Sequence, residues 1–107
     1  AVTASNHGIS CVLLDEQPAP GGQIYRSIES IPEQRGQTLG AEYLRGKELA
    51  ISFRECEAEY FPETKVWSLN RDREAGVLYK EQSKIITADQ ILVASGAMER
   101  PVPFPGW

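Results

Sequence analysis

The sequence is poor in the residues that build metal and thiol sites, with one histidine and two cysteines among its 107 residues. Cys11 and Cys56 stand far apart and form no C-x-x-C pair. Together with His7 they are too few for a zinc site of ordinary ligand number. We therefore expect no metal centre and two buried, reduced thiols, as in a cytoplasmic protein.

Two further features are lacking: an excess of basic charge and a long apolar run. The net charge is -4 and the pI is about 5.0, with lysines and arginines scattered along the chain. Binding to nucleic acid needs a concentrated basic face, so nucleic acid is not an expected partner. No apolar run approaches the roughly 18 residues that a membrane span needs. The N-terminus shows no signal-peptide pattern, and we expect a small cytoplasmic domain.

The stretch on which the rest of the chain depends is residues 9–24. Residues 9–14 are nearly all apolar, which predicts a strand buried on both faces of a parallel sheet. Residues 1–6 carry small apolar side chains and Gly8 follows, which predicts the end of a helix. Helix followed by parallel strand is the second half of a βαβ unit. The first strand and a glycine-rich loop are therefore expected just before residue 1.

The remaining segments are read from their periodicity. Residues 25–37 are polar with one proline and one glycine, and are expected to be irregular. A helix is predicted over residues 38–55, where an apolar or small stripe recurs at helical spacing. Its members are Leu39, Tyr43, Gly46, Ala50 and Phe53. A charged turn is expected at residues 71–76. The short alternating segments predict an antiparallel meander with strands at residues 65–69, 77–80 and 84–87.

The last part of the chain predicts a second buried strand and then a linker. Residues 90–97 form an apolar run that ends in small residues. Residues 101–107 contain three prolines at alternate positions, which favours an extended interdomain linker after a domain of residues 1–100. Trp67, in the expected meander, is interpreted as a packing residue more readily than as a ligand-stacking one.

Glu16 follows the strand at residues 9–14, and Gly21 and Gly22 lie five and six positions further on. In a dinucleotide-binding βαβ unit, an acid at the end of the second strand hydrogen-bonds the ribose hydroxyls. Each feature alone has a plainer explanation. Glu16 could be a solvated strand end, the paired glycines a flexible loop, and Gly96 a strand-terminating turn.

Residues 16–24, E-Q-P-A-P-G-G-Q-I, resemble the E-x4-G-G segment of the pyridine nucleotide-disulfide oxidoreductase superfamily. Residues 91–97, I-L-V-A-S-G-A, resemble its second FAD signature, with Ser95 where threonine is usual. Residues 98–107 resemble the branch that contains opine and octopine oxidase subunits, the alpha subunits of sarcosine oxidase and proline dehydrogenase, and hydrogen cyanide synthase. The resemblance extends over the whole chain.

The resemblance implies an α/β fold: a partial Rossmann-like FAD-binding domain with parallel strands and an antiparallel β-meander, lacking the first strand and the glycine-rich loop. It implies a set of residues around FAD: Glu16 on the ribose, Gly21, Gly22, Gln23 and Ile24 beside the cofactor, Ser95 and Gly96 closing the site, and Arg100 as a supporting cation. No catalytic residue is expected. NAD(P) could bind in a domain outside this chain.

The expected function is that of a fragment of an FAD-dependent oxidoreductase. By resemblance, the parent oxidises an amino acid or an opine-like secondary amine as a small-molecule substrate, and the fragment alone binds FAD weakly or not at all. The alternative is a non-catalytic interaction module. Dithiol chemistry beside the paired glycines is excluded, because Gln23, Ile24 and Tyr25 stand where disulfide reductases carry their cysteines. Unpaired strand edges predict a homo-oligomer, or a hetero-oligomer with other subunits.

Overall fold

The computed structural model describes residues 1–97, apart from the side chains of Glu33 and Gln37. Arg100 and the expected linker at residues 101–107 lie outside the described residues. The elements in chain order are α1 (Val2–Asn6), β1 (Val12–Leu14), α2 (Glu33–Leu39), α3 (Ala41–Glu55), β2 (Glu59–Phe61), β3 (Lys65–Leu69), β4 (Glu74–Tyr79) and β5 (Gln82–Thr87).

The strands form two sheets, and both expected kinds of pairing are present. β1 and β2 are parallel, with Leu13 opposite Tyr60, and the helices α2 and α3 lie between them in the chain. β3, β4 and β5 form an antiparallel sheet in that order, which confirms the predicted meander. The chain is therefore a small α/β structure.

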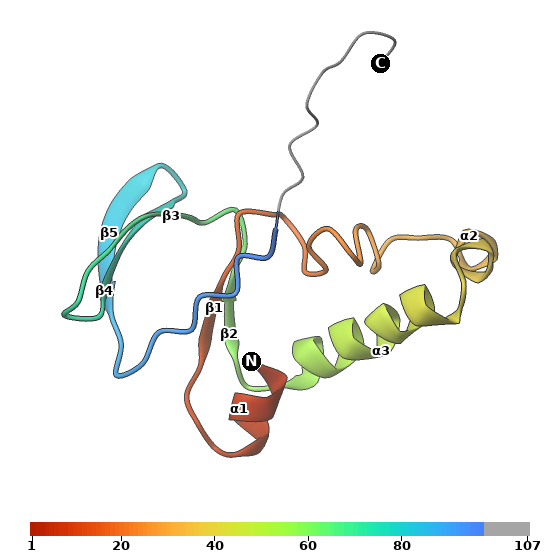
Figure 1. Ribbon diagram of the computed structural model, residues 1–107, viewed down its shortest axis with the longest axis horizontal. Helices are drawn as coiled ribbons and strands as arrows, with labels where there is room; N and C mark the ends of the chain where they lie inside the picture. The colour runs from red at the N-terminus through yellow and green to blue at the C-terminus, as the bar shows by residue number, and fades with distance from the viewer. Residues whose placement is uncertain (98–107) are drawn as a thin grey trace, which may run out of the picture.

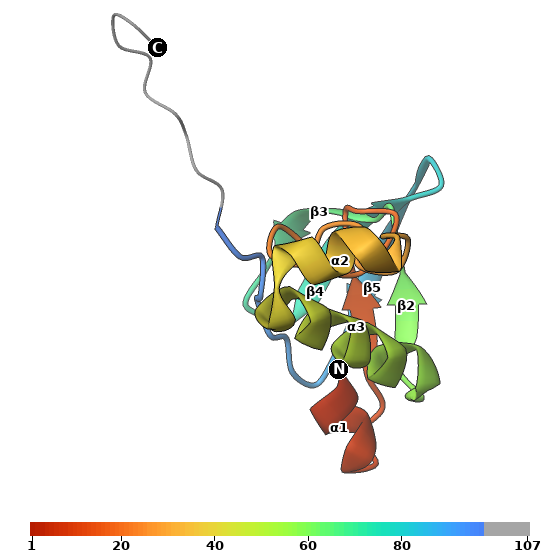
Figure 2. The ribbon, with the colours of Figure 1, turned by 90° about the vertical axis from the view of Figure 1, so that its right-hand side faces the viewer.

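Strand β2 lies between α3 and the meander (Figures 1 and 2). Successive residues of a strand point to opposite faces, and β2 uses both. Tyr60 packs edge-to-face on Phe53 of α3, with ring centroids 5.3 Å apart. Phe61 packs in the same way on Tyr79 of β4, also at 5.3 Å. These two aromatic pairs join the helix, the parallel sheet and the meander.

Helix α3 buries Gly46, Ala50 and Phe53, so most of the predicted stripe is confirmed. The expected start was wrong, because Gly40 adopts φ 93° and separates α2 from α3. Leu39 therefore belongs to α2 and is 52% exposed. The expectation of irregular structure up to residue 37 was also wrong. Pro32 directly precedes α2, and its carbonyl accepts the N–H of Gly36, so this proline flanks the first turn of a helix.

Two expected buried strands require correction. The first strand covers only Val12–Leu14, and Val12 is 44% exposed, so it is not buried on both faces. Residues 90–97 carry no strand, and Leu92 in that segment is 90% exposed. A strand forms only where another strand satisfies its N–H and C=O groups. Among residues 1–97 none pairs with this segment.

The meander is longer than predicted, because β4 begins at Glu74 inside the expected charged turn. The side chain of Asn70 makes that turn tight, since its Oδ1 accepts the N–H groups of Asp72 and Glu74. Trp67 lies at an irregularity in the β3–β4 register, beside Gly76. A Cβ on Gly76 would overlap the indole, so the contact of Trp67 is a packing one, and the ring remains 55% exposed.

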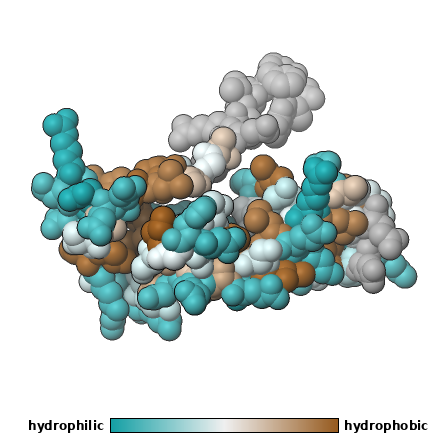
Figure 3. All heavy atoms as spheres, turned by 90° about the horizontal axis from the view of Figure 1, so that it is seen from below, coloured by the Kyte–Doolittle hydropathy of each residue, from teal (hydrophilic) through white to brown (hydrophobic). Residues whose placement is uncertain are grey.

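The apolar core of the described residues is small. It consists of Ile28, Ala50, Phe53, Ala75 and Val77. Many larger apolar side chains lie at the surface, and Figure 3 shows them in patches among the polar ones, including a broad patch toward the left where the meander lies. Cys11 and Cys56 are free thiols of intermediate exposure and are not fully buried. No helix among residues 1–97 is long and apolar enough to cross a membrane.

Candidate functional site

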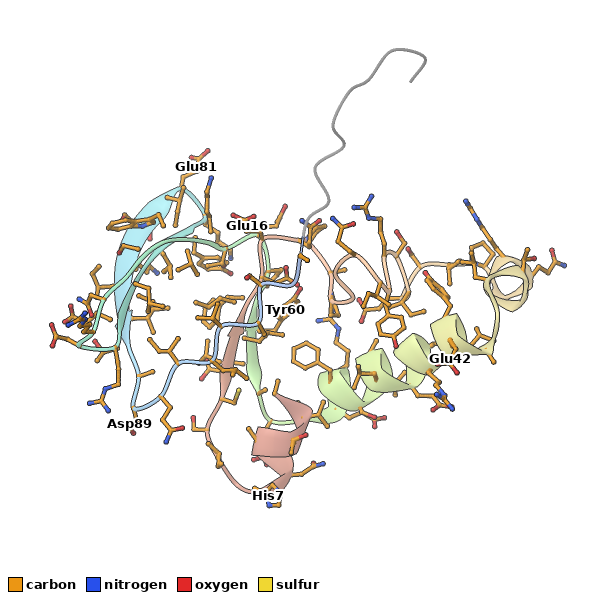
Figure 4. The ribbon with its side chains drawn as sticks, viewed as in Figure 1. His7, Glu16, Glu42, Tyr60, Glu81 and Asp89 are labelled. Atoms are coloured by element: carbon orange, nitrogen blue, oxygen red, sulfur yellow. The ribbon has the colours of Figure 1, made fainter. Side chains whose placement is uncertain are left out.

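Glu16 is exposed directly after β1, at the upper end of the strand in Figure 4. The carboxyl ends of parallel strands are where ligands bind in open α/β sheets. His7 lies at the opposite end of β1, in the turn that ends α1 (Figure 4). Glu16, and not His7, therefore lies at the carboxyl end of β1.

The neighbouring Asp15 has a structural part in this turn. Its Oδ1 accepts the N–H of Gln17 at 2.9 Å, and its backbone N–H and C=O bond to Phe61 and Thr64. The hydroxyl of Tyr60 lies 3.4 Å from Asp15 Oδ2. Because these contacts hold Asp15 in place, they also fix the turn from which Glu16 projects.

Tyr60 is a neutral group in this arrangement. Burial, the negative charge of Asp15 and the hydrogen bond to Asp15 together raise the pKa of Tyr60 to about 12. Arg54 lies over the ring, 5.2 Å from its centroid, and opposes the rise in pKa. Burial is the largest cause, because it disfavours the ionised form of the side chain. The hydroxyl of Tyr60 therefore keeps its proton, and can donate it in a hydrogen bond, at any pH below about 10.

The raised pKa of Tyr60 predicts a loss of stability in alkali. The unfolded-state pKa is 10.0, so the folded protein keeps a proton that the unfolded chain releases. The contribution to stability is complete below pH 10 and is lost as the pH rises toward 12. Allowing for partial exposure, we expect the free energy of unfolding to fall by about 1 kcal/mol over this range.

The measurement is urea unfolding of the wild type and of Tyr60→Phe at a series of pH values. Other tyrosines and the lysines titrate in the same window, so the quantity of interest is the difference between the two proteins. That difference should shrink as the pH rises from 10 to 12. Parallel pH profiles would show that Tyr60 does not contribute.

Gly21 and Gly22 have different reasons to be glycine. Both have positive φ, at 131° and 56°. Gly21 starts a turn in which its carbonyl accepts the N–H of Tyr25, and a Cβ on Gly21 would overlap the carbonyl oxygen of Tyr25. A Cβ on Gly22 would meet nothing within 4 Å. The fold therefore requires Gly21, whereas Gly22 leaves open space in front of the backbone.

The turn that carries these glycines is fixed on α3. The ring of Tyr25 lies against Gly46, close enough that a Cβ there would overlap it. The hydroxyl of Tyr43 donates to the carbonyl of Arg26. Ile28 is 1% exposed. The paired glycines therefore sit on a supported turn, not on a flexible loop.

An ion pair completes this attachment. Arg54 of α3 donates from Nε and Nη2 to the two carboxylate oxygens of Glu29, at 2.8 and 2.9 Å. The two hydrogen bonds lower the pKa of Glu29 and raise the pKa of Arg54. Since Arg54 also covers Tyr60, one side chain joins the glycine turn to β2.

The other expected site residues are placed less tightly. Gln23 Oε1 accepts a hydrogen bond from Arg26 Nη2, and Ile24 is 78% exposed. Ser95 and Gly96 are exposed in the segment without regular structure, and Gly96 has φ 69°. Among residues 1–97, no hydrogen bond joins Ser95 or Gly96 to Glu16 or to the glycine turn. Arg100 lies outside the described residues.

A shallow hollow of about 500 Å³ lies near the same end of the sheet. Glu63, which contributes to its wall, donates its backbone N–H to the carbonyl of Gln17. The lining residues are Pro62, Glu63, Lys65, Leu78, Tyr79, Lys80 and Glu81. Across residues 1–97, no group of three or more histidine, cysteine, aspartate or glutamate residues could hold a metal ion.

Sequence reasoning missed the supporting residues of the site. Asp15 carried a usable signal, because an aspartate often accepts the N–H two residues on. Tyr60, Glu29 and Arg54 carried none. Their roles depend on β2 and on the attachment of the turn to α3, and neither was predicted.

The structure thus defines the chain as an α/β unit with an exposed acid and a glycine turn near the carboxyl end of a parallel strand. Comparison with known proteins finds similarity to subunits of oxidases. An opine oxidase subunit of Rhizobium meliloti is 42% identical over 115 aligned residues, covering 100% of this chain. The opine oxidase subunit of the same name from Agrobacterium tumefaciens is 39% identical, also over 100% of the chain.

A more distant match is the hydrogen cyanide synthase subunit HcnB of Pseudomonas aeruginosa, 32% identical over 113 aligned residues. The chain spans only 22% to 24% of the length of these relatives. No protein-family model matches the chain. No solved structure gives a significant match.

Proposed function

We propose that this chain forms part of the FAD-binding region of an oxidoreductase that oxidises an amino acid or an opine-like secondary amine. The observation that carries the proposal is the similarity to opine oxidase subunits along the whole chain. It is supported by Glu16, which lies exposed where a dinucleotide-binding sheet carries its ribose-binding acid.

The residues near the end of β1 fit such a ligand. Glu16 offers an exposed carboxylate to two ribose hydroxyls, while Asp15 and Tyr60 hold the turn beneath it. Gly22 leaves room for close approach to the backbone. In the proposed site, Gly21 keeps the turn in shape, and Gln23, Ile24, Ser95, Gly96 and Arg100 complete the contacts. FAD supplies the redox chemistry when bound, and these residues bind and orient it.

The test compares FAD binding to this chain with binding to a longer form that carries a strand and a G-x-G-x-x-G loop ahead of Ala1. Backbone N–H groups of such a loop hold the pyrophosphate. We expect the longer form to bind, and Glu16→Ala to weaken its binding by about 10- to 100-fold, because hydrogen bonds to a charged group are worth about 1.5–3 kcal/mol. Calorimetry and flavin fluorescence measure the affinity.

Glu59→Ala is the matched control. Glu59 is exposed like Glu16, but it lies where β2 begins, at the other end of the two strands. The two substitutions remove the same negative charge, so a general electrostatic effect on the anionic cofactor would be the same in both and would favour binding. Equal effects of the two substitutions, or no binding by the longer form, would contradict the proposal.

A second candidate is a non-catalytic interaction module. Its support is the amount of exposed apolar surface, which includes Leu49, Ile85 and Leu92 at 55%, 60% and 90% exposure. Monomeric proteins rarely expose large contiguous apolar patches unless they meet a partner. If neither form of the chain binds FAD, this candidate becomes the better explanation.

A further inference from the structure

Two neighbouring parts of the proposed site are held by different elements of the fold. The turn that carries Glu16 is held by β2, through Tyr60 and through the backbone bonds of Asp15. The glycine turn is held by α3, since the ring of Tyr25 lies against Gly46. The two turns follow each other in the chain with no helix or strand between them. Their relative position therefore depends on side chains that contact both β2 and the glycine turn.

Arg54 of α3 is such a side chain. Its Nε and Nη2 donate to both carboxylate oxygens of Glu29, in the run of turns that follows the paired glycines. Its guanidinium carbon lies 5.2 Å from the ring centroid of Tyr60, which is on the side of β2 that faces α3. The hydroxyl of Tyr60 is 3.4 Å from Asp15 Oδ2, and Asp15 directly precedes Glu16. Contacts thus lead from the glycine turn through Arg54 to the Glu16 turn.

The contact between Arg54 and Glu29 has a defined orientation. Two hydrogen bonds from a planar guanidinium hold a carboxylate in one arrangement. A second ion pair of α3, between Arg45 and Glu42, has one hydrogen bond, at 3.1 Å. The side chains of that pair are 71% and 84% exposed, against 47% and 30% for Arg54 and Glu29. Exposed pairs with a single bond contribute little, so the pair of Arg45 is a natural reference for the pair of Arg54.

We propose that Arg54 is a positioning residue of the ligand site, which sets the separation of Glu16 from the glycine turn without contacting the ligand. The inference rests on the proposed function, because this separation matters only to a ligand that reaches both turns. A ligand of that length, such as a dinucleotide, loses part of its contacts when the two turns shift relative to each other.

The first measurement is the affinity of the longer form for FAD, by calorimetry, in Arg54→Lys and in Arg45→Lys. Lysine keeps the positive charge of arginine but cannot form the paired hydrogen bonds. General attraction to the anionic cofactor is therefore unchanged in both variants. Arg54→Lys should weaken binding by about three- to tenfold, the usual effect of losing one hydrogen bond. Arg45→Lys should leave the affinity unchanged.

A second measurement separates positioning from a loss of fold stability. If Arg54 acts by placing Glu16, its substitution matters only while Glu16 is present. In a Glu16→Ala background, Arg54→Lys should therefore change the affinity by less than about twofold. A general loss of stability would instead weaken binding equally in both backgrounds.

The third measurement needs no cofactor. In amide NMR spectra of the longer form without FAD, the signal of Gln17 reports on the Glu16 turn and the signal of Gly22 on the glycine turn. Both signals should shift in Arg54→Lys, because the two turns change their relative position. Neither should shift in Arg45→Lys.

Glu29→Gln breaks the same contact without altering Arg54. The amide keeps only one acceptor oxygen, so one of the two hydrogen bonds is lost. This variant should shift the same two amide signals as Arg54→Lys. Glu42→Gln, which removes the same charge from the pair of Arg45, should not shift them.

Three results would overturn the role of Arg54 and leave the proposed function intact. One is FAD binding by the longer form that Arg54→Lys does not weaken. Another is a loss of affinity that is equal with and without Glu16. The third is that the amide signals of Gln17 and Gly22 stay in place in Arg54→Lys. Failure of the longer form to bind FAD would overturn the proposed function, and this inference with it.

Discussion

Replacing Gly21 by alanine is expected to lower the free energy of unfolding by about 3 kcal/mol, whereas Gly22→Ala should lower it by only about 1 kcal/mol. Both positions have positive φ, which disfavours a side chain. Only at Gly21 would the new Cβ overlap another atom, the carbonyl oxygen of Tyr25. The backbone at Tyr25 must move to relieve that overlap. Because the turn is packed against α3, this movement lowers the stability of the fold.

Urea unfolding followed by circular dichroism measures both variants. The two glycines are adjacent and both substitutions add one methyl group, so Gly22→Ala controls for the loss of chain flexibility. Equal destabilisation would show that the Tyr25 carbonyl does not decide the difference. The pair of variants also separates the stability of the turn from ligand binding. Gly22→Ala should weaken the proposed binding of a ligand near Glu16 more than it destabilises the fold.

A second large effect is expected at Gly46, and its sign should depend on Tyr25. A Cβ on Gly46 would overlap the Tyr25 ring, which is held edge-to-face by Tyr43 at 6.3 Å. In the wild type, Gly46→Ala should therefore destabilise by about 2 kcal/mol. In a Tyr25→Ala background the overlap is absent. The same substitution should then stabilise by about 1 kcal/mol, the helix-propensity advantage of alanine over glycine.

The double-mutant cycle measures this coupling by urea unfolding of all four proteins. Gly36→Ala is the control, because Gly36 is also helical but its Cβ would meet only the side chain of Leu44. Its effect should be the same with and without Tyr25. If Gly46→Ala has the same sign in both backgrounds, the contact between Tyr25 and Gly46 does not fix the glycine turn.

The alternation and helical spacing of apolar residues predicted those helices and strands that depend mainly on residues close in the sequence. The alternation at Lys65–Leu69 and the stripe of Gly46, Ala50 and Phe53 correspond to β3 and to the buried side of α3. Tight turns and helical faces depend on neighbours a few residues away. For the same reason Glu16 could be placed after a strand from the sequence alone.

Pairings between distant segments could not be predicted in this way. Tyrosine and phenylalanine favour strands, but a run as short as Glu59–Phe61 predicts none by itself. It forms a strand because β1 lies beside it. Residues 90–94 show the converse, since their composition favours a strand but no partner is present among the described residues. Tyr60 was missed as a support of Asp15 because that contact exists only after β2 has formed.

The difference between local and distant pairing also bears on how the chain folds. The hairpin between β4 and β5 turns through Lys80 and Glu81, both with positive φ, as a two-residue hairpin that matches strand twist requires. The three strands of the meander follow one another directly, so each pairing closes a short loop. The β1–β2 pairing must close a loop that contains both α2 and α3.

The meander should therefore form early and open last, while the parallel pair forms late and opens at lower free energy. The Glu16 turn belongs to the half that opens first. Any ligand held there would slow the opening of β1, the glycine turn and α3, and leave exchange within the meander unchanged. Ligand binding at this end of the sheet would thus reduce the difference in opening free energy between the two halves of the chain.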